Sequence, residues 1–146
     1  MFATAEANVS RDLRGFLKIG MKYGMASDVL KPCFGMTETS SVMIYYDSFG
    51  LENTHDEDRF VPIGSPVNGH TLRITDDNGN LVKKGEIGKI ECKGDTVLSG
   101  YYKNPKANGE SFTEDGFFIT GDLGYIEGTD ITLRRQIGRA SCRERV

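Results

Sequence analysis

Residues 70–93 constrain the fold of this chain more than any other part of its sequence. Apolar side chains alternate with polar ones in two short runs, at Leu72 and Ile74 and again at Ile90 and Cys92. A period of two is typical of half-buried strands, because successive side chains point to opposite faces. A tight-turn sequence, Asp-Asn-Gly-Asn at 77–80, separates the two runs. We therefore predict a small antiparallel, barrel-like subdomain over residues 61–135.

Residues 1–60 have a different pattern, which predicts part of an α/β subdomain. A helix is expected after Ser10, a candidate N-cap, because apolar residues recur at helical spacing at Leu13, Phe16, Leu17 and Met21. A short buried strand is expected over residues 29–34, and it leads into a polar turn over residues 35–41. The apolar run 42–46 is left open between conformations, and the acidic stretch 47–59 is expected to be a loop.

Two further elements are expected in the second half of the chain. Asn104-Pro105 introduces a short helix over residues 104–112, because proline is favoured in a first helical turn. Residues 117–126 are expected to form a strand, a sharp turn at Gly121-Asp122 and a second strand.

Charge and composition exclude several functions. The formal net charge of −3 gives no basic surface for nucleic acid, so we expect no nucleic-acid partner. No apolar run is long enough to span a bilayer, and the N-terminus lacks the pattern of a signal peptide. The widely spaced Cys33, Cys92 and Cys142 indicate reduced thiols in a cytoplasmic protein and argue against a structural zinc site. Cys33 is expected to be a buried structural thiol.

The segment 136–146 does not continue these patterns. It contains Arg139, Arg143 and Arg145 and almost no apolar periodicity. Its residues can be back-translated into codons that match a widely used short-read sequencing adapter. We therefore interpret it as translated adapter, to be excluded from fold reasoning, with a native basic tail as the alternative. Genomic sequence that continues through this junction with the same codons would contradict the interpretation.

The segment Phe34-Gly35-Met36-Thr37-Glu38 contains the first candidate site residues. Gly35 lets a planar ligand approach the backbone, and Phe34 offers an aromatic face. Thr37 can donate a hydrogen bond to a phosphate oxygen, and Glu38 is a hard oxygen ligand suited to Mg²⁺. By itself, such a segment is more often an ordinary corner between a strand and a loop than a binding site.

A second candidate site is Thr120-Gly121-Asp122. A carboxylate after a glycine turn can accept hydrogen bonds from both hydroxyls of a ribose. Gly-Asp is also a common turn, so this segment alone does not indicate a nucleotide. Among the other polar and aromatic residues, Tyr101 and Tyr102 are expected to pack rather than bind, and His70 to lie on a strand surface.

Several segments occur in the order and at the spacing of motifs in one known family. The chain resembles the adenylate-forming (AMP-binding) superfamily, which includes acyl-CoA synthetases, fatty acyl-AMP ligases and the adenylation domains of nonribosomal peptide synthetases. Ala5-Glu6-Ala7 is similar to a Gly-Glu-Ala/Pro motif, with alanine in place of glycine. The other matching segments are 34–38, Gly85-Glu86-Ile87-Gly88 with the following Gly100-Tyr101 and Asn104-Pro105, and 112–125.

The resemblance implies ATP or AMP and Mg²⁺ as cofactors and assigns roles to the matched residues. Phe34, with Gly35 and Met36 beside it, would pack against adenine, and Glu6 and Ala7 would line the opposite wall.

Four polar residues would bind the rest of the nucleotide or its Mg²⁺. Thr37 would contact the α-phosphate and Glu38 would hold Mg²⁺, which makes both candidate catalytic residues. Asp122 would bind the ribose hydroxyls. Arg135 lies near the position of a nucleotide-binding arginine in the family, although the pattern around it departs from the usual Gly-Arg.

The implied reaction joins a carboxylic acid to ATP as acyl-AMP and then passes the acyl group to CoA or to a phosphopantetheine carrier protein. The family's phosphate loop and C-terminal lysine do not occur in this sequence. We therefore expect a central fragment of the family's large N-terminal domain, of the α/β class, that is inactive alone. The overall sequence pattern of residues 61–128 favours loading ligases of polyketide or nonribosomal peptide synthesis. The alternative is a noncatalytic nucleotide-binding or interaction module that retains the barrel.

Overall fold

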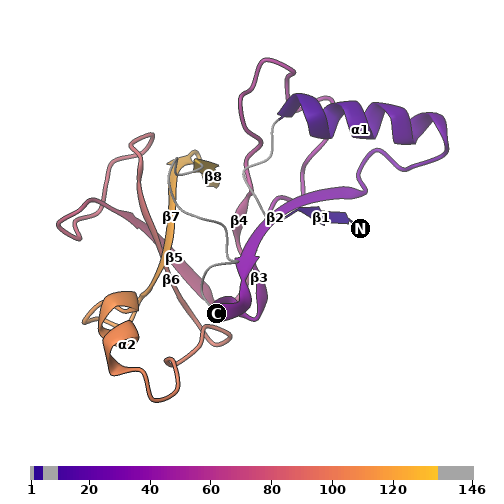
Figure 1. The fold of residues 1–146 in the computed structure, drawn as a ribbon. Helices are drawn as coiled ribbons and strands as arrows, with labels where there is room; N and C mark the ends of the chain where they lie inside the picture. Colours follow the sequence, from indigo (N-terminus) through magenta and orange to yellow (C-terminus); the bar gives the residue numbers. More distant parts are fainter. Residues whose placement is uncertain (1, 5–9, 135–146) are drawn as a thin grey trace.

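The computed structural model describes residues 2–4 and 10–134. Two four-stranded sheets lie side by side, with strand orders β1-β2-β3-β4 and β5-β6-β7-β8 (Figure 1). The strands are β1 (Phe2–Thr4), β2 (Leu30–Met36), β3 (Ser41–Tyr45), β4 (Ser65–Pro66), β5 (His70–Thr75), β6 (Gly88–Gly94), β7 (Phe118–Glu127) and β8 (Asp130–Arg134). The helices are α1 (Ser10–Lys22), α2 (Pro105–Ser111) and the single 3₁₀ turn η1 (Thr37–Thr39).

The first sheet confirms the predicted α/β unit. The strands β1 and β2 are parallel neighbours, and α1 is the connection between them. The helix packs through the fully buried Leu17 against Leu30 of β2, whereas Phe16 is 51% exposed although it shares the predicted helical spacing. The apolar run 42–46, whose conformation the sequence left open, belongs mostly to β3, an antiparallel neighbour of β2.

The predicted loop after β3 is confirmed, and a buried arginine of α1 holds it. Nη1 of Arg14 donates to the carbonyl oxygen of Leu51 at 2.8 Å and to Oγ1 of Thr54 at 2.8 Å. Its Nε pairs with Asp56 at 2.5 Å. Ser10, considered above as an N-cap, donates from its hydroxyl to the carbonyl oxygen of His55 at 2.7 Å. These contacts fix the loop because they satisfy its backbone acceptors.

The second sheet confirms the antiparallel prediction. The strand β5 pairs over its whole length with β6, with Leu72 opposite Cys92 and Ile74 opposite Ile90. Three of these four side chains, those of Ile74, Ile90 and Cys92, are buried. The short helix expected over residues 104–112 is α2, and the Asn104 side chain accepts a hydrogen bond from the backbone N–H of Ala107 at 3.1 Å.

The predicted strand–turn–strand over residues 117–126 is wrong, because β7 is one continuous strand. It pairs with β6 on both sides of Gly121, with Glu91 opposite Ile119 and Lys89 opposite Leu123. Only Ile90 lies between these pairs on β6, whereas residues 120–122 lie between them on β7. The extra residues form a bulge, which bends a strand without ending it. The chain reverses later, between β7 and β8, and the sequence reading did not predict β8.

One hydrophobic core joins the two sheets. Phe34, Met43 and Ile44 of the first sheet belong to the same buried cluster as Ile90 and Phe118 of the second. The backbone joins them as well, because the N–H of Ile131 donates to the carbonyl oxygen of Gly64 at 2.8 Å. Since β2 and β7 contribute to one core, the two candidate turns that they carry have a common support.

Some sequence predictions concern residues for which no structure is described. Glu6, Ala7, Arg135 and the segment 136–146 lie outside the described residues. The division of the chain at residue 60 stays a prediction, and β4, which follows it, pairs with β3 in the first sheet. Within residues 2–4 and 10–134, no helix is both long enough and apolar enough to cross a bilayer.

Candidate functional site

The turn that follows β2 is held together by Thr39. Its side chain is 1% exposed, and Oγ1 accepts a hydrogen bond from the backbone N–H of Met36 at 3.0 Å. The same hydroxyl lies within hydrogen-bond distance of the carbonyl oxygens of Met36 and Ser41, at 3.0 and 3.2 Å. A hydroxyl that bonds the backbone of its own turn stabilises that turn. Thr39 therefore shapes the turn, a role that sequence reasoning missed.

Backbone geometry at this turn is unusual at two positions, and the chain approaches itself closely at a third. Ser40 and Ser41 have φ values of 56° and 108°, which are costly for residues with a side chain. A Cβ on Gly35 would lie 1.5 Å from the carbonyl oxygen of Ser41, so only glycine fits there. From the sequence, Gly35 was expected to let a ligand approach the backbone. In the structure, the backbone at Ser41 also lies so close to Gly35 that a side chain would not fit.

The two predicted adenine-binding side chains beside Gly35 lie inward. Phe34 is only 5% exposed and belongs to the core cluster, and Met36 is half-buried and packs against that cluster. The ring of Phe34 therefore packs in the core of the described chain. Its contact with adenine stays a prediction.

Thr37 and Glu38 follow β2 in η1, and Thr37 is the one exposed residue of the segment 34–38. Thr37 is exposed and Glu38 is half-buried at the start of η1. Oε1 of Glu38 accepts a hydrogen bond from the hydroxyl of Tyr101 at 3.0 Å, and its carbonyl oxygen accepts one from the N–H of Leu98 at 2.8 Å. Tyr101 packs against the core, as expected, whereas Tyr102 is 86% exposed, which contradicts the packing prediction for it. The contact between Tyr101 and Glu38 carried no signal in the sequence.

The second candidate turn is the bulge of β7. The hydroxyl of Thr120 donates to the carbonyl oxygen of Ile90 at 2.9 Å and accepts from the N–H of Asp122 at 3.1 Å. Gly121 has a φ of 81°, which a glycine adopts without strain. Thr120 thus replaces a missing ladder bond, and Gly121 supplies the bend. Together they set the position of Asp122, which is half-buried.

The donors in the site suit Mg²⁺ only as a partial set of ligands. No group of three or more His, Cys, Asp and Glu side chains that could hold a metal occurs among residues 2–4 and 10–134. Mg²⁺ commonly takes one or two carboxylates and completes its shell with water and substrate phosphate. A lone carboxylate at Glu38, beside the hydroxyl of Thr37, fits that pattern and does not fit a cage made of protein ligands alone.

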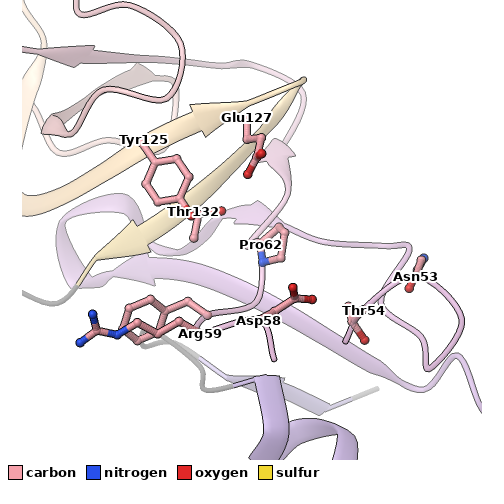
Figure 2. A pocket seen from close by; sticks show the side chains of 9 residues that line it. Asn53, Thr54, Asp58, Arg59, Pro62, Tyr125, Glu127 and Thr132 are labelled. Atoms are coloured by element: carbon pink, nitrogen blue, oxygen red, sulfur yellow. The ribbon is translucent and has the colours of Figure 1, made fainter. Parts of the chain in front are cut away.

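A pocket of about 450 Å³ lies away from both candidate turns, between the loop 53–62 and the hairpin of β7 and β8. Figure 2 shows side chains of both segments around it. Its lining contains none of the predicted site residues and consists of Asn53, Thr54, Asp58, Arg59, Phe60, Pro62, Tyr125, Glu127 and Thr132. This mixed lining lacks the mainly apolar walls typical of small-molecule sites.

A comparison with known protein families identifies the family of this chain. Residues 2–102, which are more than half of the chain, match the family described as AMP-binding enzyme. The chain belongs to this adenylate-forming family, as the sequence motifs predicted.

Individual relatives give the same result. Nonribosomal peptide synthetase atqA of Aspergillus terreus is 40% identical over 126 residues, which cover 84% of this chain and 13% of the relative. The structure of McyG A-PCP complexed with phenylalanyl-adenylate has a TM-score of 0.85 and 36% identity, over 90% of this chain and 24% of that one. ATP-bound MatB from Rhodopseudomonas palustris has a TM-score of 0.66 and 30% identity, also over 90% and 24%.

The predicted fold class is confirmed by these similarities. The chain is a fragment that matches adenylation domains, with a mixed sheet and helix and a separate antiparallel sheet. It spans about an eighth of the length of the curated relative and about a quarter of each solved chain.

Proposed function

We propose that this chain is the central part of an ATP-dependent ligase that activates a carboxylic acid as acyl-AMP. Its family membership supports the reaction class, and the solved relatives described with ATP and with phenylalanyl-adenylate support the nucleotide. The acyl group would then pass to the thiol of CoA or of a phosphopantetheine carrier protein. Similarity to nonribosomal peptide synthetases favours the carrier protein.

One observation supports the proposal most strongly. The carboxylate of Glu38 is held at 3.0 Å by the hydroxyl of Tyr101, next to the exposed hydroxyl of Thr37. A fixed carboxylate beside a free donor suits a cation and a phosphate at the same point. An ordinary corner between a strand and a loop needs neither a buried side chain that bonds the backbone of the turn, as Thr39 does, nor the strained φ at Ser41.

Each proposed site residue has a different part of the nucleotide or its Mg²⁺ as its partner. Thr37 donates to the α-phosphate, and Glu38 would hold Mg²⁺. When bound, Mg²⁺ supplies positive charge that offsets the charge of the phosphates. Asp122 accepts hydrogen bonds from the ribose hydroxyls.

The base would lie against the strand that precedes the turn. Phe34, Gly35 and Met36 would form one wall of the proposed adenine site, and Glu6 and Ala7, which lie outside the described residues, would form the other. Arg135, also outside them, would add a further nucleotide contact. The inward position of Phe34 means that backbone atoms near Gly35 supply much of that wall.

The proposed function is tested by ATP–pyrophosphate exchange in the complete protein that contains this chain, with a panel of carboxylic acids. We expect Glu38→Gln and Asp122→Ala each to lower the exchange rate by roughly 10²-fold or more, because each removes a charged contact to the nucleotide. Glu57→Gln and Asp77→Ala are matched controls at exposed positions and should leave the rate within about twofold of wild type. Undiminished exchange in both site variants would contradict the assigned roles.

A noncatalytic nucleotide-binding module is the alternative. It is distinguished by equilibrium binding of ATP to the complete protein together with the exchange assay. ATP binding without exchange for any acid would favour the module. The isolated 146-residue chain is expected to give no exchange.

A further inference from the structure

The loop between β6 and α2 lies on the η1 turn and bonds to it at several points. Thr96 donates from Oγ1 to the carbonyl oxygen of Thr39 at 3.0 Å, and Ser40 donates from Oγ to the carbonyl oxygen of Thr96 at 2.9 Å. The Leu98 N–H and the Tyr101 hydroxyl bond to Glu38, as described above. Three of these bonds satisfy backbone acceptors, and that of Tyr101 reaches the carboxylate of Glu38.

We propose that Tyr101 is a positioning residue, which holds the carboxylate of Glu38 in the orientation that binds a divalent cation. This inference rests on the proposed function. A phenol at neutral pH is a hydrogen-bond donor, and an ionised carboxylate only accepts. The bond between them is charge-assisted, and such bonds are stronger and more directional than neutral ones. Because the bond is made to Oε1, the orientation of Oε2 is fixed with it.

Tyr101 is itself held in place from two sides. Its ring packs against the core cluster. Its backbone N–H donates to Oδ1 of Asn108 in α2 at 2.6 Å, and Nδ2 of Asn108 donates back to its carbonyl oxygen at 3.1 Å. A hydroxyl on a ring with fixed backbone and packing can impose an orientation, because little freedom remains to be lost when the bond forms.

The opposite side of the loop is anchored to β5. Nε2 of His70 lies 2.8 Å from Oγ1 of Thr96. The two atoms are therefore within hydrogen-bond distance, and the same Oγ1 bonds the carbonyl oxygen of Thr39. A continuous chain of bonds therefore joins β5 to the turn that carries Glu38. The prediction that His70 lies on a strand surface missed this contact.

The matched variants are Tyr101→Phe and Tyr102→Phe in the complete protein. Each removes one hydroxyl and keeps the ring, and Tyr102 is 86% exposed. We expect Tyr101→Phe to raise the Mg²⁺ concentration for half-maximal pyrophosphate exchange about tenfold, with the rate at saturating Mg²⁺ recovering to within about twofold. Tyr102→Phe should leave both quantities within about twofold of wild type.

Two further measurements separate positioning from stability. Binding of Mn²⁺ in the presence of ATP, followed by electron paramagnetic resonance, should weaken about tenfold in Tyr101→Phe and stay unchanged in Tyr102→Phe. In a Glu38→Gln background, Tyr101→Phe should weaken Mn²⁺ binding no further, because the two residues act through one carboxylate.

A lowered unfolding midpoint in Tyr101→Phe with unchanged Mg²⁺ and Mn²⁺ dependence would overturn the positioning role. If the complete wild-type protein exchanges pyrophosphate with no acid, the proposed function fails. In that case the Mn²⁺ binding comparison alone decides the role of Tyr101.

Discussion

The guanidinium of Arg73 lies over the ring of Phe117, with Cζ 3.9 Å from the ring centroid. It also contacts both carboxylate oxygens of Asp115, at 2.5 and 3.0 Å, and its Nε pairs with the buried Glu91 at 2.6 Å. One arginine of β5 therefore binds the turn that leads into β7. Because β7 carries Asp122, this arginine helps to fix where the second candidate turn lies.

This contact predicts an acid sensitivity of the fold. The hydrogen bond from Arg73, followed by that from Thr113, holds the pKa of Asp115 at about 2. Since this pKa is below its ordinary value of 3.8, the ionised carboxylate stabilises the folded chain above about pH 4. That contribution is lost as the pH falls from about 4 toward 2. Asp115→Asn should flatten this part of the decline in the free energy of unfolding, measured by urea titration at successive pH values.

The control for the acid experiment is Asp77→Asn, at a side chain that is 93% exposed. It should keep the wild-type slope between pH 4 and 2. A residual slope is expected in Asp115→Asn because hydrogen bonds also lower the pKa of Asp56 and of Asp76. Equal slopes in wild type and Asp115→Asn would show that the Arg73 contact does not stabilise the fold.

Gly35 and Gly15 should respond in opposite directions to replacement by alanine. A Cβ at Gly35 would lie 1.5 Å from the carbonyl oxygen of Ser41, so Gly35→Ala forces the turn apart. We expect a loss of at least about 2 kcal/mol in the free energy of unfolding. A Cβ at Gly15 of α1 meets nothing within 4 Å, so Gly15→Ala should add about 0.5–1 kcal/mol. Urea denaturation of the 146-residue chain measures both, and a neutral Gly35→Ala would refute the close approach.

Ile90 should be the more costly of two nearby isoleucines to truncate. It is fully buried in the core that joins the two sheets, whereas Ile87 is 41% exposed. Ile90→Ala leaves a cavity and should lower the free energy of unfolding by about 2–5 kcal/mol. Ile87→Ala should cost less than about 1 kcal/mol. The pair is compared by guanidinium denaturation, and similar losses in both would contradict a shared core centred on β6.

Cys92 should resist alkylation in the folded chain. Its side chain is fully buried, and burial raises the pKa of its thiol to about 12. Because the thiolate is the reactive form, iodoacetamide at pH 8 should label Cys92 far more slowly in buffer than in guanidinium. Peptide mass mapping after timed quenching gives both rates. Equal rates in the two conditions would place Cys92 outside the core.

Elements with strong local patterns were predictable from sequence. The β5 and β6 strands follow from alternation at Leu72, Ile74, Ile90 and Cys92, because side-chain direction in a strand depends only on sequence separation. The start of α2 follows from Asn104-Pro105, since a cap acts on amides a few residues away. These predictions needed no knowledge of distant residues.

Errors occurred where local signals were ambiguous. Gly121-Asp122 predicts a turn, yet β6 pairs with β7 on both sides of it, and this pairing makes the segment a bulge. The burial of Phe34 was also not predicted, because residues of the second sheet share the core in which its ring lies, whereas its contact with adenine stays a prediction. In both cases a neighbouring strand decided the local packing, and that neighbour is not specified by the local sequence.

The sequence by itself determined the family, the short strands and the turn that carries Thr37 and Glu38, because motif order and periodicity are properties of the chain alone. Only the tertiary structure decided what holds that turn. Tyr101 reaches Glu38 across 63 residues of sequence, and its hydroxyl arrives there because the second sheet packs on the same core as β2. Contacts of that separation depend on how surfaces pack in three dimensions, and residue spacing does not encode them.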